Sequence, residues 1–185
     1  MTATTTIFQY AKSTNPDVLA LVERNTEGWR AFKDAACAFA SRHGAEKGTF
    51  VPSNAFGSWR IAAIGNAATP KPTEGRWKRG PGGRGWVPFK NSPLAGEMEA
   101  IAFWSETAPG YPEIVESAYD ADFSHRIGAA IPFAVDGVAY VGFGFIPADD
   151  RKKGDPAAGG WVEITGSEFQ AAVDAYNESA KRQEA

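Results

Sequence analysis

Residues 128–147 read GAAIPFAVDGVAYVGFGFIP, and this stretch decides the fold more firmly than any other part of the chain. Asp136 and Gly137 stand between two apolar runs, and both tolerate the positive φ that the central positions of a type I′ turn need. Apolar side chains alternate with other residues on each side of the turn, which is the period of a β-strand. The stretch therefore predicts a β-hairpin at the centre of the sheet.

One face of this hairpin carries little side-chain volume. Gly142 and Gly144 alternate with apolar residues on the second arm, and glycine at such positions lets another part of the structure approach the backbone closely. We expect either that the tryptophans of residues 76–90 cover this face or that it stays open to a ligand or partner.

Two helices are predicted near the N-terminus, after a short edge strand or arm at residues 7–10. The sequence at 15–17, Asn-Pro-Asp, supplies an N-cap, a proline for the first turn and an acid near the positive end of the helix dipole. Asn25 and Thr26 predict a break or a kink, and a longer helix follows over about 27–43. Its apolar residues share one stripe at helical spacing: Trp29, Phe32, Ala36, Phe39 and Ala40.

The remaining elements mix strands and helices in an irregular order. They are strands at 47–52 and 58–64, a short edge strand at 86–89, helices at 92–105 and 113–119, a strand at 161–164 and a last helix. Thr165 and Glu168 have the spacing of a capping box for that last helix. The irregular order favours an α+β fold, with a mainly antiparallel sheet centred on the 128–147 hairpin and helices packed on one face.

Composition and length bound the class of protein. The chain has 185 residues, 43% hydrophobic and 22% charged, which is ordinary for a soluble globular protein and fits a single domain, 1–185. Cys37 is the one cysteine, so no intrachain disulfide can form. Residues 1–14 lack a signal-peptide pattern, and no apolar stretch reaches membrane-spanning length. These features predict a cytoplasmic protein without a membrane span.

Charge is distributed unevenly, although the net charge of −3 argues against a nucleic-acid coat over the whole surface. Residues 71–90 contain six basic side chains and one acid, whereas residues 91–124 contain seven acids and no Lys or Arg. Either the two segments neutralise each other across a surface, or they form a bipolar surface that selects a partner by charge.

The basic segment overlaps a long loop predicted at about 65–85, which holds six Gly and three Pro. A loop of this length in a compact domain is usually functional or disordered. Its RGPGGRG stretch, 79–85, could bring backbone N–H groups and arginines to a phosphate. It is not a P-loop, because the GxxxxGK[ST] spacing is absent. The alternative is a flexible surface loop.

Aromatic and basic residues are interleaved over 76–90. This combination is typical of single-strand nucleic-acid binders, which stack bases and neutralise phosphates, and of protein-interface hot spots. Alternatively, both tryptophans anchor the loop to the core. The predicted binding residues are Arg76, Trp77, Lys78, Arg79, Arg84, Trp86 and Lys90.

Catalytic and metal signatures are weak. His125 has acids and Ser124 near it in sequence, but neighbours in sequence rarely form a catalytic triad, and no GxSxG elbow is present. His43 at a helix end is explained by the helix dipole, and Cys37 by a small core position. We therefore predict no cofactor, no metal and no catalytic residue, with a small enzyme around 122–126 as the least favoured alternative.

The leading hypothesis is a non-enzymatic interaction protein whose partner is a protein or a ribonucleoprotein complex. A compact, Trp-rich α+β chain without a catalytic motif is similar in type to small phage or mobile-element proteins. That likeness implies, in its most specific form, a phage-type inhibitor of a host defence complex. The second hypothesis is a nucleic-acid or nucleotide-phosphate binder that uses 76–90. The oligomeric state is left open.

Overall fold

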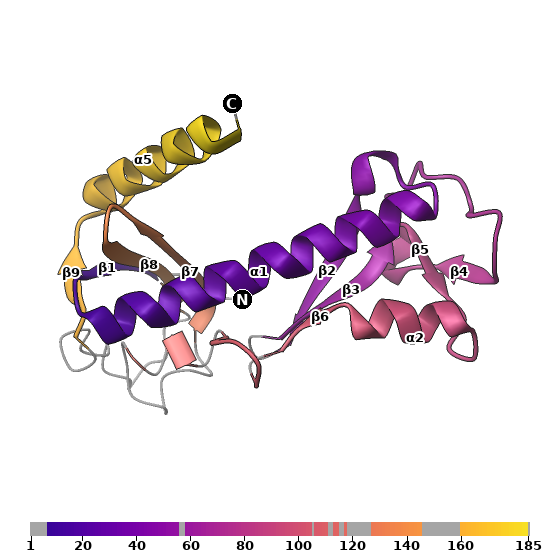
Figure 1. Ribbon diagram of the computed structural model, residues 1–185, viewed down its shortest axis with the longest axis horizontal. Coiled ribbons are helices and arrows are strands. Elements are labelled where there is room, and N and C mark those ends of the chain that lie inside the picture. The colour runs from indigo at the N-terminus through magenta and orange to yellow at the C-terminus, as the bar shows by residue number, and fades with distance from the viewer. Residues whose placement is uncertain are drawn as a thin grey trace, which may run out of the picture. The chain divides into compact units, whose positions relative to one another are not determined.

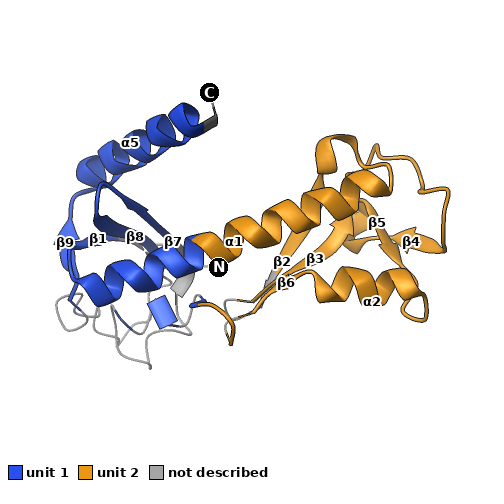
Figure 2. Cartoon of the chain, viewed as in Figure 1, with its two compact units in different colours: residues 1–26, 109–185 blue, residues 27–108 orange. Residues whose placement is uncertain are grey.

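The computed structural model describes residues 7–55, 58–104, 106–110, 113, 114, 117, 127–145 and 160–184. The fold is α+β with antiparallel sheets, as predicted (Figure 1). The chain divides into two compact units, which Figure 2 colours separately: unit 1 is 1–26 with 109–185, and unit 2 is 27–108. That residues 1–185 form a single domain stays a prediction.

The helices and strands of the two units are as follows. Unit 1 holds β1 (Ile7–Ser13), the start of α1 (Pro16–Arg42), β7 (Ile127–Val135), β8 (Val138–Phe145), β9 (Val162–Ile164) and α5 (Gly166–Glu184). Unit 2 holds the rest of α1, the 3-10 helix η1 (Glu46–Gly48), β2 (Phe50–Ala55), β3 (Ser58–Ile64), β4 (Trp77–Arg79), the 3-10 helix η2 (Pro81–Gly83), β5 (Trp86–Pro88), α2 (Pro93–Ala100) and β6 (Ala102–Phe103).

The predicted hairpin is confirmed as β7 and β8. Asp136 and Gly137 have φ of 51° and 75°, as a type I′ turn requires, and Val135 pairs with Val138 across it. The sheet of unit 1 has the order β7-β8-β1-β9, so β8 is interior and β7 lies at one edge. The predicted edge strand at 7–10 is wrong in position, because β1 lies between β8 and β9 and pairs with both.

Helices pack on both faces of this sheet, which corrects the expectation that they pack on one. On one face, Val18 and Val22 of α1 join a core with Val141, Phe143 and Trp161. On the other, α5 contributes Phe169 and Ala172 to a cluster with Phe133 and Ile164. Side chains of a strand alternate between faces, so apolar residues at successive positions of β8 need a cover on each side.

The glycine face of β8 is covered at Gly142 by α5 and β1. A Cβ built at Gly142 would lie 3.1 Å from the Phe169 ring and 3.4 Å from the Tyr10 ring, and those two rings contact each other at 4.6 Å between centroids. The face was expected either to be covered by the tryptophans of 76–90 or to stay open. Both expectations are wrong at Gly142, because the rings of Phe169 and Tyr10 cover it. The missing side chain makes room for Phe169.

The predicted break at Asn25 and Thr26 is also wrong, because α1 is continuous from Pro16 to Arg42. Thr26 Oγ1 donates to the carbonyl of Val22 at 3.0 Å, which an intact helix permits. Asn25 Nδ2 donates instead to the carbonyl of Pro109 at 2.6 Å. Each polar side chain has a partner that leaves the helical hydrogen bonds in place.

Unit 2 has one apolar core, built from the predicted stripe of α1 and its sheet. Phe32, Ala36, Phe39 and Ala40 are buried, and the half-buried Trp29 packs against Trp59 with tilted rings, 4.4 Å apart between centroids. The strand order is β2-β3-β5-β4, with β6 also pairing with β3. The predicted apolar stripe of α1 is therefore confirmed as a core-facing surface of the helix.

Two predicted elements of unit 2 differ from the structure. The helix expected over 92–105 ends at Ala100, and Phe103 then pairs with Trp59 in the sheet, where its buried ring packs against Gly28. The segment 86–89 was expected at an edge, yet β5 lies between β3 and β4. The missing N–H of Pro88 is tolerated there because β3 pairs with β5 only at Trp86.

The last helix begins with the predicted capping box. The backbone N–H of Thr165 donates to Glu168 Oε2 at 3.0 Å, and the backbone N–H of Glu168 donates to Thr165 Oγ1 at 3.2 Å. The bond from the Thr165 backbone lowers the pKa of the Glu168 carboxyl below its ordinary value of 4.5, and the Thr165 hydroxyl and Lys12 lower it further. The ionised carboxylate is thus the form that caps α5.

This arrangement predicts a pH-dependent contribution of Glu168 to stability. Because folding lowers the pKa, the stabilisation is fully present above the unfolded-state pKa and is lost as pH falls through the lowered one. The melting-temperature difference between wild type and Glu168→Gln should stay constant from neutral pH to about pH 5 and shrink below it. Thr165→Ala should cost about 1 kcal/mol at neutral pH. A difference that is unchanged at about pH 3 would contradict the capping role.

Candidate macromolecule-binding surface

Residues 76–90 form a hairpin, which we call the basic hairpin. β4 and β5 pair in the register Trp77 with Pro88, Lys78 with Val87 and Arg79 with Trp86. The loop predicted over 65–85 therefore contains a strand, β4, and the single turn η2. Sequence reasoning missed this pairing because neither strand is longer than three residues.

The glycine-rich end of the basic hairpin uses backbone N–H groups within itself. The amide of Gly80 donates to the Gly85 carbonyl at 3.1 Å, that of Gly83 to Gly80 at 3.1 Å and that of Arg84 to Pro81 at 3.3 Å. A phosphate cradle needs converging N–H groups that are free. Three amides of the RGPGGRG stretch are therefore already hydrogen-bonded to carbonyls of the same stretch and are not free to bind a phosphate.

The two tryptophans anchor the basic hairpin to unit 2. Trp77 is 2% exposed, and its indole Nε1 donates to the Glu74 carbonyl at 2.6 Å. Trp86 is half-buried, and its Nε1 donates to the Thr69 carbonyl at 2.8 Å. A buried Trp with its N–H satisfied supports a fold. Trp77 accordingly contributes packing and no exposed contact area.

Two arginines lie over aromatic rings of the basic hairpin. The Arg79 guanidinium carbon lies 4.0 Å from the Trp86 ring centroid, and Arg79 Nη1 also donates to the Ala67 carbonyl at 3.4 Å. The Arg76 guanidinium lies 4.9 Å from the ring of Phe89, which is 39% exposed. Such stacking holds a guanidinium in a defined orientation and leaves edge N–H donors available.

Strand alternation separates the side chains of the basic hairpin into two faces. Trp77 points into the core, so Lys78 points to the opposite side and is exposed, whereas its partner Val87 is half-buried and packs against the core of unit 2. The Phe89 amide donates to the Arg76 carbonyl at 3.0 Å, which extends the pairing by one step. Arg76 and Phe89 are also exposed, and we call the three residues Arg76, Lys78 and Phe89 the outer face.

The positive charge of the basic hairpin is not neutralised within the described parts of the chain. Its five basic side chains are all exposed, and no carboxylate among the described residues forms an ion pair with any of them: Arg76, Lys78, Arg79, Arg84 and Lys90.

The nearby acids of α2 have other partners. Glu97 pairs with Arg42 of α1, and Glu99 pairs with Arg60 of β3 at 3.2 Å. The acids after residue 90 were one expected source of neutralising charge for the basic segment. For Glu97 and Glu99 this expectation is wrong, because both pair with other arginines. Among the described residues, no carboxylate therefore offsets the positive charge of the hairpin surface.

The other candidate sites have less structural support. The predicted alternative site at 122–126, with His125, lies outside the described residues. His43 packs between Phe39 and Trp77, at 4.8 and 5.3 Å between ring centroids. Across the described ranges, no three His, Cys, Asp or Glu side chains gather as a metal site. Within the described part of the chain, no helix is long and apolar enough to cross a membrane.

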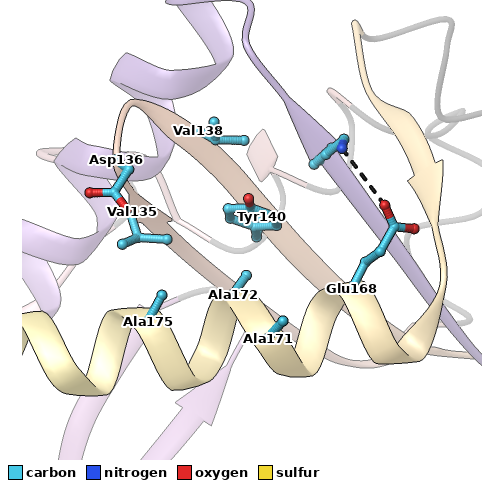
Figure 3. A pocket seen from close by; sticks show the side chains of 9 residues that line it. Val135, Asp136, Val138, Tyr140, Glu168, Ala171, Ala172 and Ala175 are labelled. Carbon is cyan, nitrogen blue, oxygen red and sulfur yellow. Dashed lines mark ion pairs between the residues drawn. The ribbon is translucent and has the colours of Figure 1, made fainter.

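A shallow hollow of about 330 Å³ lies in unit 1 between α5 and the β7–β8 hairpin (Figure 3). Ala171, Ala172 and Ala175 of α5 face Tyr140 of β8 across it, and the Lys12–Glu168 ion pair, 3.8 Å long, stands at one end. Its alanines leave space between helix and sheet. An exposed ion pair adds little binding energy, so this hollow is a weaker candidate than the basic hairpin.

Comparison of the chain with protein-family models, with curated proteins and with solved structures gave no match.

Two glycines of the basic hairpin form a matched pair for mutation. Gly85 and Gly83 both have positive φ, at 61° and 71°, but a Cβ at Gly85 would overlap the Ile64 carbonyl oxygen, whereas one at Gly83 meets nothing within 4 Å. Gly83→Ala should cost about 1–2 kcal/mol through backbone strain alone. Gly85→Ala should cost distinctly more, measured by urea unfolding. Equal costs would contradict the close packing of Gly85 on β3.

Proposed function

We propose that this protein is a non-enzymatic interaction protein that binds a larger macromolecular partner through the basic hairpin. The observation that carries this proposal is the set of five exposed basic side chains without a carboxylate partner among the described residues. Clusters of unpaired like charge destabilise a surface unless a partner of opposite charge binds there.

The difference in charge between the units supports the same proposal. Unit 2 has eleven Lys and Arg against seven Asp and Glu, and unit 1 has eight against fifteen. An uneven distribution of this kind steers and orients an approaching partner. Unit 2 is accordingly the part of the chain that an acidic partner meets.

In its most specific form, the proposed partner is a protein or a ribonucleoprotein complex of a host defence system, and this protein is its phage-type inhibitor in the cytoplasm. The sequence character supports this form: the chain is small, rich in Trp and free of catalytic motifs. Inhibition would follow from occupying a surface that the complex needs. The binding proposal does not depend on this finer identification.

The second candidate function is nucleic-acid binding through the same hairpin. The specific observation in its favour is the stacking of Arg76 on Phe89 and of Arg79 on Trp86. Guanidinium groups held in this way present oriented donors to phosphate oxygens.

Affinity capture from a host lysate tests the proposal. A tagged wild-type chain should retain a partner, and Arg79→Glu/Arg84→Glu should lose most of it, because four units of charge change on the proposed surface. The two chains should be compared by quantitative mass spectrometry of the captured proteins and by sequencing of any captured nucleic acid.

A matched control places the same charge change elsewhere in unit 2. Arg30 and Lys33 are exposed on α1, and Arg30→Glu/Lys33→Glu should retain the partner. Melting temperatures of all three chains establish that they are folded. Equal capture by wild type and the hairpin variant would rule out the basic hairpin as the binding surface.

A further inference from the structure

The basic hairpin offers little apolar area to a protein partner. The exposed large hydrophobic side chains of the described residues are Phe89 and Val162, and Val162, 60% exposed, belongs to unit 1. Phe89 is partly covered by the Arg76 guanidinium. Cores of protein–protein interfaces are enriched in aromatic residues, Met and Arg and depleted in Lys, Glu and Asp, whereas the basic hairpin exposes two lysines and, as large aromatic side chains, Phe89 alone among the described residues. The surface therefore differs from a typical protein-binding hot spot.

We infer that the basic hairpin recognises the phosphate backbone of a single-stranded nucleic acid, either free or as part of a ribonucleoprotein complex. This inference rests on the proposed function and names the chemical group that the proposed surface binds. Four basic side chains are proposed to bind the phosphates, because none of them has a hydrogen-bond acceptor or an ion-pair partner within the described part of the chain: Arg76, Lys78, Arg84 and Lys90.

The spacing of two cations on the outer face suits one nucleic-acid backbone. Arg76 and Lys78 are two positions apart, so they follow one another at about 6.6 Å along the strand. That spacing is comparable to the separation of successive phosphates on one nucleic-acid strand, so the two side chains can follow a single backbone.

The Arg76–Phe89 pair adds a surface for an unpaired base. Unstacked bases pack on aromatic rings and on guanidinium planes, and the guanidinium over the partly exposed Phe89 ring supplies both. Arg79 has a different part, since its contacts to Trp86 and the Ala67 carbonyl hold it against unit 2. Arg79 contributes mainly to the local positive potential.

Fluorescence anisotropy with the full chain tests this inference. The probes are a labelled oligothymidylate of about 20 nucleotides and a duplex of the same length. Four phosphate contacts predict a slope of about −2.8 in log affinity against log salt, or about a 50-fold loss between about 50 and 200 mM salt. Lys78→Gln/Arg84→Gln should reduce the slope to about −1.4, and the matched Arg30→Gln/Lys33→Gln should leave it unchanged. The duplex should bind more weakly than the single strand.

Three outcomes would overturn the inference. One is a salt-independent affinity or no binding to the oligothymidylate. Another is equal displacement of the oligonucleotide by polyglutamate at the same concentration of charge, which would assign the surface to protein carboxylates. The third is an equal loss of slope in the control variant. If lysate capture depends on Arg79 and Arg84 while oligonucleotides do not bind, the docking proposal stands and the phosphate inference fails. If oligonucleotides bind but the lysate yields no captured partner, the phosphate inference stands and the proposed function fails.

Discussion

Burial of Trp77 is the interaction on which the basic hairpin depends. Its ring lies in the core of unit 2, and its N–H is satisfied by the Glu74 carbonyl. Because side chains alternate along a strand, a core position at Trp77 turns Arg76 and Lys78 away from the core. One buried side chain thereby orients two of the five exposed basic residues.

Ion pairing decides the charge of that surface. The first acids that follow the basic hairpin in sequence lie on α2, and Glu97 and Glu99 form their ion pairs with Arg42 and Arg60. These exposed pairs contribute little to stability, but they leave the cations of the hairpin without those two carboxylates. The distribution of partners, and not the number of charges, makes the hairpin a candidate surface.

The hairpin β7–β8 and the basic hairpin have different roles. In the first, Gly142 makes room for Phe169, and the ring of Tyr10 packs on that ring, so the glycine is an internal packing position. In the second, Gly83 has open space beyond its Cα, while Gly85 contacts the Ile64 carbonyl. A glycine in a strand or turn can therefore either make room for a neighbouring side chain or backbone atom, or leave the backbone open to solvent. The atoms near its Cα distinguish the two cases.

The sequence by itself determined the features whose partners lie within a few residues. The Asp136–Gly137 turn, the Thr165–Glu168 capping box and the α1 apolar stripe are of this kind, and so is the concentration of positive charge at 71–90. Only the tertiary structure decided what depends on distant partners. The Pro109 carbonyl accepts from Asn25 within the continuous helix α1, Phe169 covers Gly142, and burial turns Trp77 inward. The physical reason is that local hydrogen bonds and periodicity are written in neighbouring residues, whereas packing and ion pairing depend on which remote segments the folded chain brings together.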